Sequence, residues 1–99
     1  MEIIHLENEK DFNDLIKKED RVLVDFFANW CGPCKMLAPA LEKAESKVKV
    51  IKVDTDEFDD LSRKYGVMSI PTIILFEKGK EVKRNIGFID KSKIEEFVK

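Results

Sequence analysis

The segment from Val22 to Ala28 is apolar at every position except Asp25. A strand with one face in water alternates apolar and polar residues, whereas a strand covered on both faces is apolar almost throughout, as in the interior of a parallel sheet. We therefore predict a buried strand here, with helices covering both faces of its sheet.

The rest of the chain alternates between strand-like and helix-like patterns. Runs rich in branched apolar residues predict strands, and apolar residues at helical spacing predict helices. The resulting order, β-α-β-α-β-α-β-β-α, predicts an α/β fold whose mixed central β-sheet has a parallel part plus an antiparallel hairpin, with helices on both faces. The predicted strands cover 2–5, 22–28, 48–53, 72–77 and 82–87. The predicted helices start after Asn8, at Cys31 or Pro33 (ending near Lys47), after Asp56 and after Asp90, and the side chains of Asn8, Asp56 and Asp90 are the predicted N-caps.

Length and composition favour a single domain spanning residues 1–99, since 43% of the 99 residues are apolar and nothing divides the chain. The longest apolar run, Ile73–Phe76, is far shorter than the roughly 18 residues of a membrane helix. No secretory signal is visible, and the net charge of −2 argues against nucleic acid or an anionic membrane as a partner. We expect a small soluble protein of the cytoplasm.

Cys31 and Cys34 are the only cysteines. A structural disulfide framework would use more cysteines, spread along the chain, so this close pair indicates redox chemistry or part of a metal site. One helical turn holds two such Cβ atoms about 5 to 6 Å apart, and a small adjustment would allow a disulfide. A four-residue ring contributes only about 2 kcal/mol of stability. Such a bond suits a redox switch better than a structural cross-link.

The two cysteines are predicted to be inequivalent. At a helix N-terminus, the unpaired N–H groups and the positive end of the dipole stabilise a thiolate, which is the attacking species. Cys31 is therefore the predicted nucleophile. Cys34, one turn deeper, is expected to be more buried and to act as the resolving cysteine.

Half of a zinc site is the alternative interpretation of the cysteine pair. Structural zinc takes four ligands, and the only histidine, His5, is distant, so dimerisation would have to complete the site. Haem attachment needs a histidine after the second cysteine, where Lys35 stands. A Gly-rich dinucleotide motif is also missing. We expect no metal and no bound cofactor.

Three further residues are candidates for the site. Burial would raise the pKa of Asp25 and suit it to general-base catalysis, unless it faces water at a strand edge. Lys52 lies in an alternating strand, where a solvated lysine is the simpler interpretation. Trp30 could be a core residue, but a tryptophan beside a reactive thiol more often covers a binding surface.

Residues 24–35, with the sequence VDFFANWCGPCK, resemble the active-site segment of the thioredoxin family. Residues 65–72, YGVMSIPT, resemble the cis-proline loop of the same family, and the predicted element order matches across essentially the whole chain. The resemblance implies a thioredoxin fold and a monomer. It also implies a protein-disulfide reductase that works by dithiol–disulfide exchange through a reversible Cys31–Cys34 disulfide.

The resemblance also implies roles for individual residues. Pro71 would be cis and lie beside the cysteine pair, and Lys52 would lie near Asp25 and modulate it. Gly32 and Pro33 would set the redox potential. The docking surface for disulfide-containing protein substrates would consist of Trp30, Gly32, Pro33, Ile70 and Gly87. Thioredoxin reductase, drawing on NADPH, would regenerate the dithiol.

Two other functional classes stay open from the sequence. The chain could be a binding module that docks partners without redox turnover, or it could be an oxidant or isomerase. Gly32 and Pro33 argue against the second class, whose members usually carry a histidine between the cysteines.

The sequence departs from the family pattern at two positions near the site. Phe27 stands where many bacterial relatives have tryptophan, and Phe88 follows Gly87 where a small residue is frequent. We expect these two departures to affect partner choice rather than chemistry.

Overall fold

The computed structural model describes all residues, 1–99, and contains the predicted elements in the predicted order. A short 3-10 helix, η1, precedes the first α-helix. The strands are β1 (Ile3–His5), β2 (Arg21–Phe27), β3 (Lys49–Asp54), β4 (Thr72–Glu77) and β5 (Lys80–Ile86); the helices are η1 (Glu9–Asp11), α1 (Phe12–Lys18), α2 (Gly32–Lys43), α3 (Asp59–Lys64) and α4 (Lys91–Phe97).

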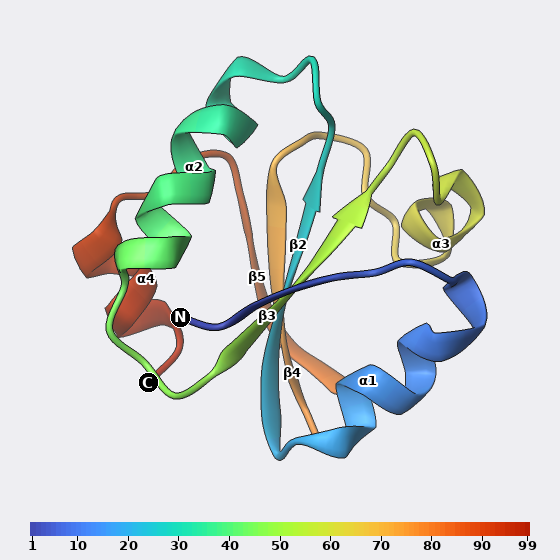
Figure 1. The fold of residues 1–99 in the computed structure, drawn as a ribbon, viewed down its shortest axis with the longest axis horizontal. Coiled ribbons are helices and arrows are strands. Elements are labelled where there is room, and N and C mark those ends of the chain that lie inside the picture. The colour runs from blue at the N-terminus through green and yellow to red at the C-terminus, as the bar shows by residue number, and fades with distance from the viewer.

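The five strands form one mixed sheet in the order β1-β3-β2-β4-β5. The first three of these strands are parallel, and β4 runs antiparallel to both β2 and β5. Helices α2 and α4 cover one face of the sheet, and α1 and α3 lie on the other (Figure 1). The prediction of a mixed sheet between two helical layers is confirmed. The strand predicted to be buried, β2, lies at its centre, and its five inner residues are all buried.

Side chains of β2 alternate between the two cores. Val22, Val24 and Phe26 pack on the side of α1 and α3, while Leu23 packs on the side of α2 and α4. Because successive strand residues point to opposite faces, Asp25 lies on the same side as Leu23. Its carboxylate is therefore directed toward the layer that contains α2, the helix that begins at the cysteine pair.

Helix α2 ends at Lys43, four residues before the predicted end near Lys47. Ala44 is buried and turns to an extended conformation, with ψ of 136°. The next backbone N–H, that of Glu45, donates to the Glu95 carboxylate of α4 at 2.7 Å. The chain therefore leaves the helix early because the core and the neighbouring helix bind the residues that follow it.

Two of the three predicted helix caps are wrong. The side chain of Asn8 makes no capping bond; the residue precedes η1, and α1 begins only at Phe12. Asp56 does not cap α3, which begins at Asp59. Instead, Asp54 accepts the N–H of Asp56 at 2.9 Å, so the preceding aspartate organises this turn.

The cap of the last helix is as predicted, with Asp90 accepting the N–H of Lys93 at 3.0 Å. The hairpin is tighter than predicted, because β5 begins at Lys80 and leaves only Lys78 and Gly79 in the turn. Both turn residues have positive φ, 52° and 82°. Such turns match the right-handed twist of the paired strands, which explains the glycine.

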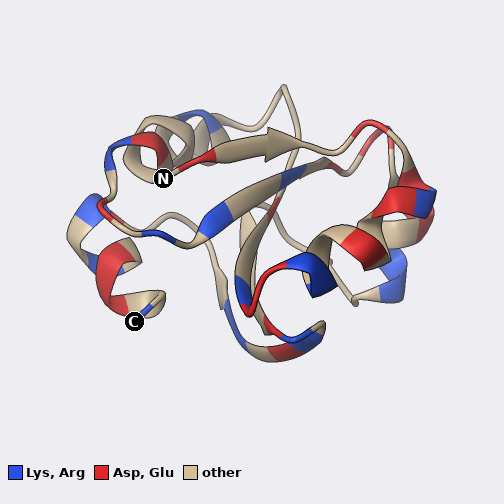
Figure 2. Cartoon of the chain, turned by 60° about the horizontal axis from the view of Figure 1, so that its bottom comes forward, with Lys and Arg blue, Asp and Glu red and all other residues tan.

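Charged residues of both signs are interspersed over the helices and strand ends (Figure 2). No helix combines the length and the apolar composition that crossing a bilayer requires.

Candidate active site

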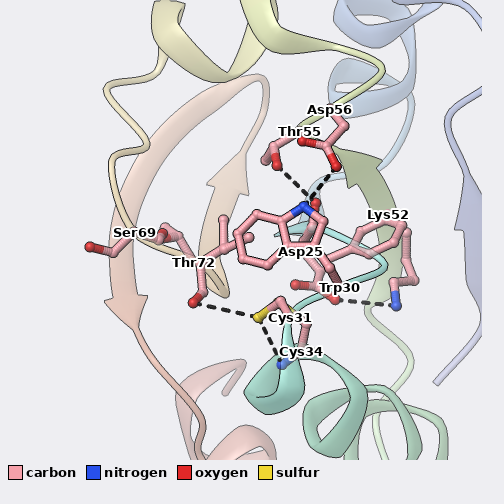
Figure 3. Close-up of a disulfide and its surroundings, with 11 residues drawn as sticks. Asp25, Trp30, Cys31, Cys34, Lys52, Thr55, Asp56, Ser69 and Thr72 are labelled. Atoms are coloured by element: carbon pink, nitrogen blue, oxygen red, sulfur yellow. Dashed lines mark hydrogen bonds and ion pairs between the residues drawn. A yellow bond between two sulfur atoms is a disulfide. The ribbon is translucent and has the colours of Figure 1, made fainter.

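Cys31 and Cys34 form a disulfide at the junction between β2 and α2 (Figure 3). Their Cα atoms are 5.2 Å apart. Both residues are buried, with exposed fractions of 5% and 3%. The two cysteines therefore differ in burial much less than predicted.

The two cysteines do differ in their position at the start of α2. Cys31 is the N-cap of α2, in an extended conformation, and its Sγ atom accepts the backbone N–H of Cys34 at 3.2 Å. Pro33 fits the first turn because this position needs no N–H donor. The sulfur of Cys31 thus lies at the positive end of the helix, where a thiolate is stabilised.

Asp25 is fully buried, and neither of its carboxylate oxygens has a hydrogen-bond partner. It pairs in register with Lys52 of β3, whose Nζ lies 3.6 Å from Oδ2. Burial raises the pKa of the Asp25 carboxyl to about 6, against an opposing effect of the nearby ammonium group. The lysine is only 10% exposed, so it is not the solvated residue that the sequence pattern alone favoured.

A small pocket lies between Lys52 and Cys34. Its volume is about 190 Å³, and both Cys34 and Lys52 line it. The remaining lining residues are Phe27, Ala28, Asn29, Lys35 and Ala38. A pocket of this size and polarity can hold several water molecules between Cys34 and the ammonium group beside Asp25.

The loop before β4 brings backbone groups to the disulfide. The Ile70–Pro71 peptide bond is cis, and the carbonyl oxygen of Ile70 lies 3.7 Å from Sγ of Cys31. Gly87 donates its N–H to the Pro71 carbonyl at 2.8 Å. Its φ of +97° strongly favours glycine. The loop at Ile70 therefore lies against the Cys31 sulfur, and the chain at Gly87 is bound to that loop through Pro71.

Trp30 lies beside the disulfide and is 69% exposed, so it is not a core residue. Its indole N–H donates to the Asp56 carboxylate at 2.9 Å, which orients the ring (Figure 3). Gly32 and Pro33 are also exposed. The disulfide is therefore bordered by an exposed aromatic ring with a fixed orientation.

The family model named Thioredoxin matches residues 3–99 of this sequence. The chain belongs to the thioredoxin family. It is 41% identical over 98 residues to a thioredoxin of Mycoplasmoides gallisepticum, covering 96% of this chain and 98% of that protein. It is 49% identical over 88 residues to a thioredoxin of Chlamydia caviae, covering 86% and 85%. A mutant thioredoxin from Halobacterium salinarum superposes with a TM-score of 0.92 at 34% identity, over 98% and 88% of the two chains.

Thioredoxin-family membership and the Cys31–Cys34 disulfide together identify a thiol–disulfide oxidoreductase that acts by dithiol–disulfide exchange. Proteins of this family generally act on disulfide substrates and work with thioredoxin reductase. Both cysteines are in the disulfide, and no cluster of three or more metal-ligating side chains is present.

The sequence did not predict two side-chain contacts, those of Asp56 and Arg84. Asp56 was predicted to cap a helix, and its position in the sequence gave no indication that it would bind Trp30. Arg84 of β5 donates to the carbonyl of Tyr65 at 2.8 Å, at the start of the loop that leads to Pro71, while it also binds Glu81. The spacing of Glu81 and Arg84 suggests an ion pair, but the carbonyl contact depends on tertiary structure.

Proposed function

We propose that this thioredoxin-family chain is a protein-disulfide reductase that keeps protein thiols reduced in the cytoplasm, as a monomer formed by a single domain of residues 1–99. The observation that carries the proposal is the hydrogen bond from the Cys34 N–H to Sγ of Cys31 at the start of α2. This hydrogen bond favours a thiolate on Cys31. A reductase needs one defined thiolate to attack the target disulfide first.

The reaction has two exchange steps. In the first, the Cys31 thiolate attacks one sulfur of a target disulfide, forms a mixed disulfide and releases the other target sulfur as a thiolate, which takes up a proton. In the second, Cys34 loses its proton and attacks Sγ of Cys31, which releases the remaining target thiolate. Two electrons pass to the target, and the protein is left with the Cys31–Cys34 disulfide.

Asp25 is the proposed base for Cys34. A carboxyl with a pKa of about 6 is a suitable proton acceptor near neutral pH. Water in the pocket lined by Cys34 and Lys52 would carry the proton, because the carboxylate has no direct hydrogen-bond partner. Lys52 modulates Asp25 by stabilising its charged form.

The remaining residues serve docking and redox tuning in this proposal. Trp30 provides exposed apolar surface, Ile70 offers backbone groups 3.7 Å from the reactive sulfur, and Pro71 is hydrogen-bonded through its carbonyl to Gly87. Gly32 and Pro33 form the ring of the disulfide and would set its redox potential.

Regeneration by thioredoxin reductase, at the expense of NADPH, completes the cycle. The test is insulin reduction with the purified chain, NADPH and the reductase of the same organism. The proposal predicts continuous NADPH consumption that disappears in Cys31→Ser. Absence of turnover in the wild-type chain with either an NADPH-dependent or a ferredoxin-linked reductase would contradict the proposal, and partner binding that persists in both proteins would then identify a binding module. Turnover that requires a ferredoxin-linked reductase would replace the proposed electron donor only.

A further inference from the structure

Phe27, the last residue of β2, holds an aromatic ring against the ammonium group of Lys52. The Nζ atom lies 4.3 Å from the ring centre, and the same atom lies 3.6 Å from Oδ2 of Asp25. Because Asp25 and Lys52 are register partners, Phe27, two residues further on the same face, is the diagonal neighbour of the lysine. One ammonium group therefore contacts an aromatic ring and a buried carboxylate simultaneously.

The surroundings make the aromatic contact significant. An ammonium group over an aromatic face is attracted by the ring quadrupole, and the attraction grows when water is excluded. The lysine side chain is only 10% exposed. The end of β2 is also fixed, because the carbonyl of Phe27 accepts both the N–H of Thr55 at 2.8 Å and its hydroxyl at 3.1 Å.

The ring also reaches the cysteine pair. Phe27 packs against the small buried cluster formed by Ala28, Cys31 and Cys34, and it lines the 190 Å³ pocket together with Cys34 and Lys52. Phe27 is thus in contact with the surroundings of Cys34 and with Lys52, the cation that modulates the proposed base Asp25.

We propose that Phe27 is a positioning residue for the second exchange step, because its ring holds the Lys52 ammonium group between the Asp25 carboxylate and the pocket at Cys34. The proposal rests on the proposed role of Asp25 as the base. Phe27 stands where many relatives have tryptophan, and the proposal gives this difference a role in the chemistry in place of the role in partner choice predicted from the sequence.

Other charged or titratable groups surround Lys52. His5 is its register partner on β1 and is exposed. Lys35 of α2 lines the same pocket as Cys34. Asp54, two residues further along β3, is engaged by the N–H of Asp56 and by the amide of Asn29. On the other side of Asp25, β4 offers the apolar Ile73. Asp25 is the group with which the lysine forms its ion pair.

The experiment follows both exchange steps in one reaction. Reduced protein is mixed with 5,5′-dithiobis(2-nitrobenzoate): attack by Cys31 releases a first thionitrobenzoate, and attack by Cys34 on the mixed disulfide releases a second. The rate of the second phase is measured from about pH 5 to about pH 9 to obtain its midpoint. The variants are Phe27→Leu, which removes the ring face, and Phe27→Trp, which keeps one.

We expect Phe27→Leu to slow the second phase about twofold to tenfold below the midpoint, the range of one cation–π contact, and to move the midpoint to higher pH. The reason is that a less restrained ammonium group stabilises the Asp25 carboxylate less. Phe27→Trp should retain the wild-type midpoint. In the Lys52→Met background, Phe27→Leu should cause no further shift, because the cation on which the ring acts is gone.

An unchanged midpoint in Phe27→Leu, or an equal shift with and without Lys52, would overturn the proposal, because a purely structural ring would affect stability and not this coupling. If Phe27→Leu folds poorly, Phe27→Ile in both Lys52 backgrounds provides the same comparison. Asp25→Asn distinguishes a failure of the base assignment from a failure of the role proposed for Phe27. A second-phase pH profile that is unchanged in Asp25→Asn refutes the base assignment, whereas a profile altered in Asp25→Asn but not in Phe27→Leu refutes only the role of Phe27.

Discussion

The ammonium nitrogen of Lys52 lies 3.6 Å from a carboxylate oxygen of Asp25, and neither oxygen of this fully buried carboxylate accepts a hydrogen bond. One cation at this distance offsets only part of the free-energy cost of removing a carboxylate from water. The pKa of Asp25 therefore rises to about 6, and the site keeps a group that can take up a proton near neutral pH.

Asp25→Asn should stabilise the disulfide form at pH 7. A pKa raised from the ordinary value of 3.8 to about 6 corresponds to a loss of about 3 kcal/mol when the carboxyl ionises, and the buried amide cancels part of the gain. We expect a net increase of about 1 to 3 kcal/mol in the free energy of unfolding. Denaturant unfolding at pH 7 measures it, and a less stable variant that resolves mixed disulfides at the wild-type rate would contradict it.

The same group predicts the sign of the pH dependence. Between pH 3.8 and about 6 the native state binds more protons at Asp25 than the unfolded state does, so this group lowers stability as the pH rises through that range. The gain from Asp25→Asn should therefore shrink as the pH is lowered toward 3.8. A gain that is constant over this range would mean that ionisation of Asp25 is not its cause.

Cys31 should react with iodoacetamide well before Cys34 in the reduced protein. Its sulfur accepts the backbone N–H of Cys34 and lies at the N-terminus of α2, where a thiolate is stabilised. Mass mapping after brief alkylation measures the order. Equal labelling of both cysteines, or faster labelling of Cys34, would refute the division of roles.

Asp56→Ala should weaken docking of protein substrates more than the chemistry. The carboxylate accepts the indole N–H of Trp30 at 2.9 Å, and without it the exposed ring loses its fixed orientation. We expect KM for insulin to rise about twofold to tenfold, with little change in the rate toward a small aromatic disulfide. Asp60→Ala, in the nearby helix α3, serves as the matched control. Equal effects of both substitutions would indicate a general charge effect.

Arg84→Ala should destabilise the fold by about 1 to 2 kcal/mol, because the partly buried carbonyl of Tyr65 loses a charged donor. Arg63→Ala is the control, since Arg63 forms an exposed pair with Asp59 whose loss should cost about 0.5 kcal/mol or less. Thermal or denaturant unfolding of both variants gives the comparison. Similar losses would mean that the contact with Tyr65 contributes nothing beyond a surface ion pair.

The sequence was sufficient for the architecture, because apolar patterning specifies which strands are covered on both faces. The run around Asp25 predicted the central strand, and the helix beginning at the cysteine pair followed from Pro33 and the apolar spacing behind it. Helix ends were less predictable. α2 stops at Lys43 because Ala44 is buried and Glu95 binds the next N–H, and both contacts come from distant parts of the chain.

The site was predictable where the residues carry their own chemistry, as the two cysteines and Asp25 do. It was not predictable where a role depends on which segments meet. The residue pattern alone favoured a solvated Lys52, and only the family resemblance indicated its place near Asp25, which the strand register explains. The contact of Trp30 with Asp56 and that of Lys52 with Phe27 likewise depend on tertiary structure.

In the proposed mechanism Cys31 attacks the target disulfide and Cys34 resolves the mixed disulfide. To test this order, reduced Cys34→Ser is mixed with a disulfide-containing protein and the products are identified by mass spectrometry. We expect a stable mixed disulfide between the substrate and Cys31, and none with reduced Cys31→Ser under the same conditions. A mixed disulfide that forms on Cys34 in Cys31→Ser, with no adduct in Cys34→Ser, would reverse the two roles.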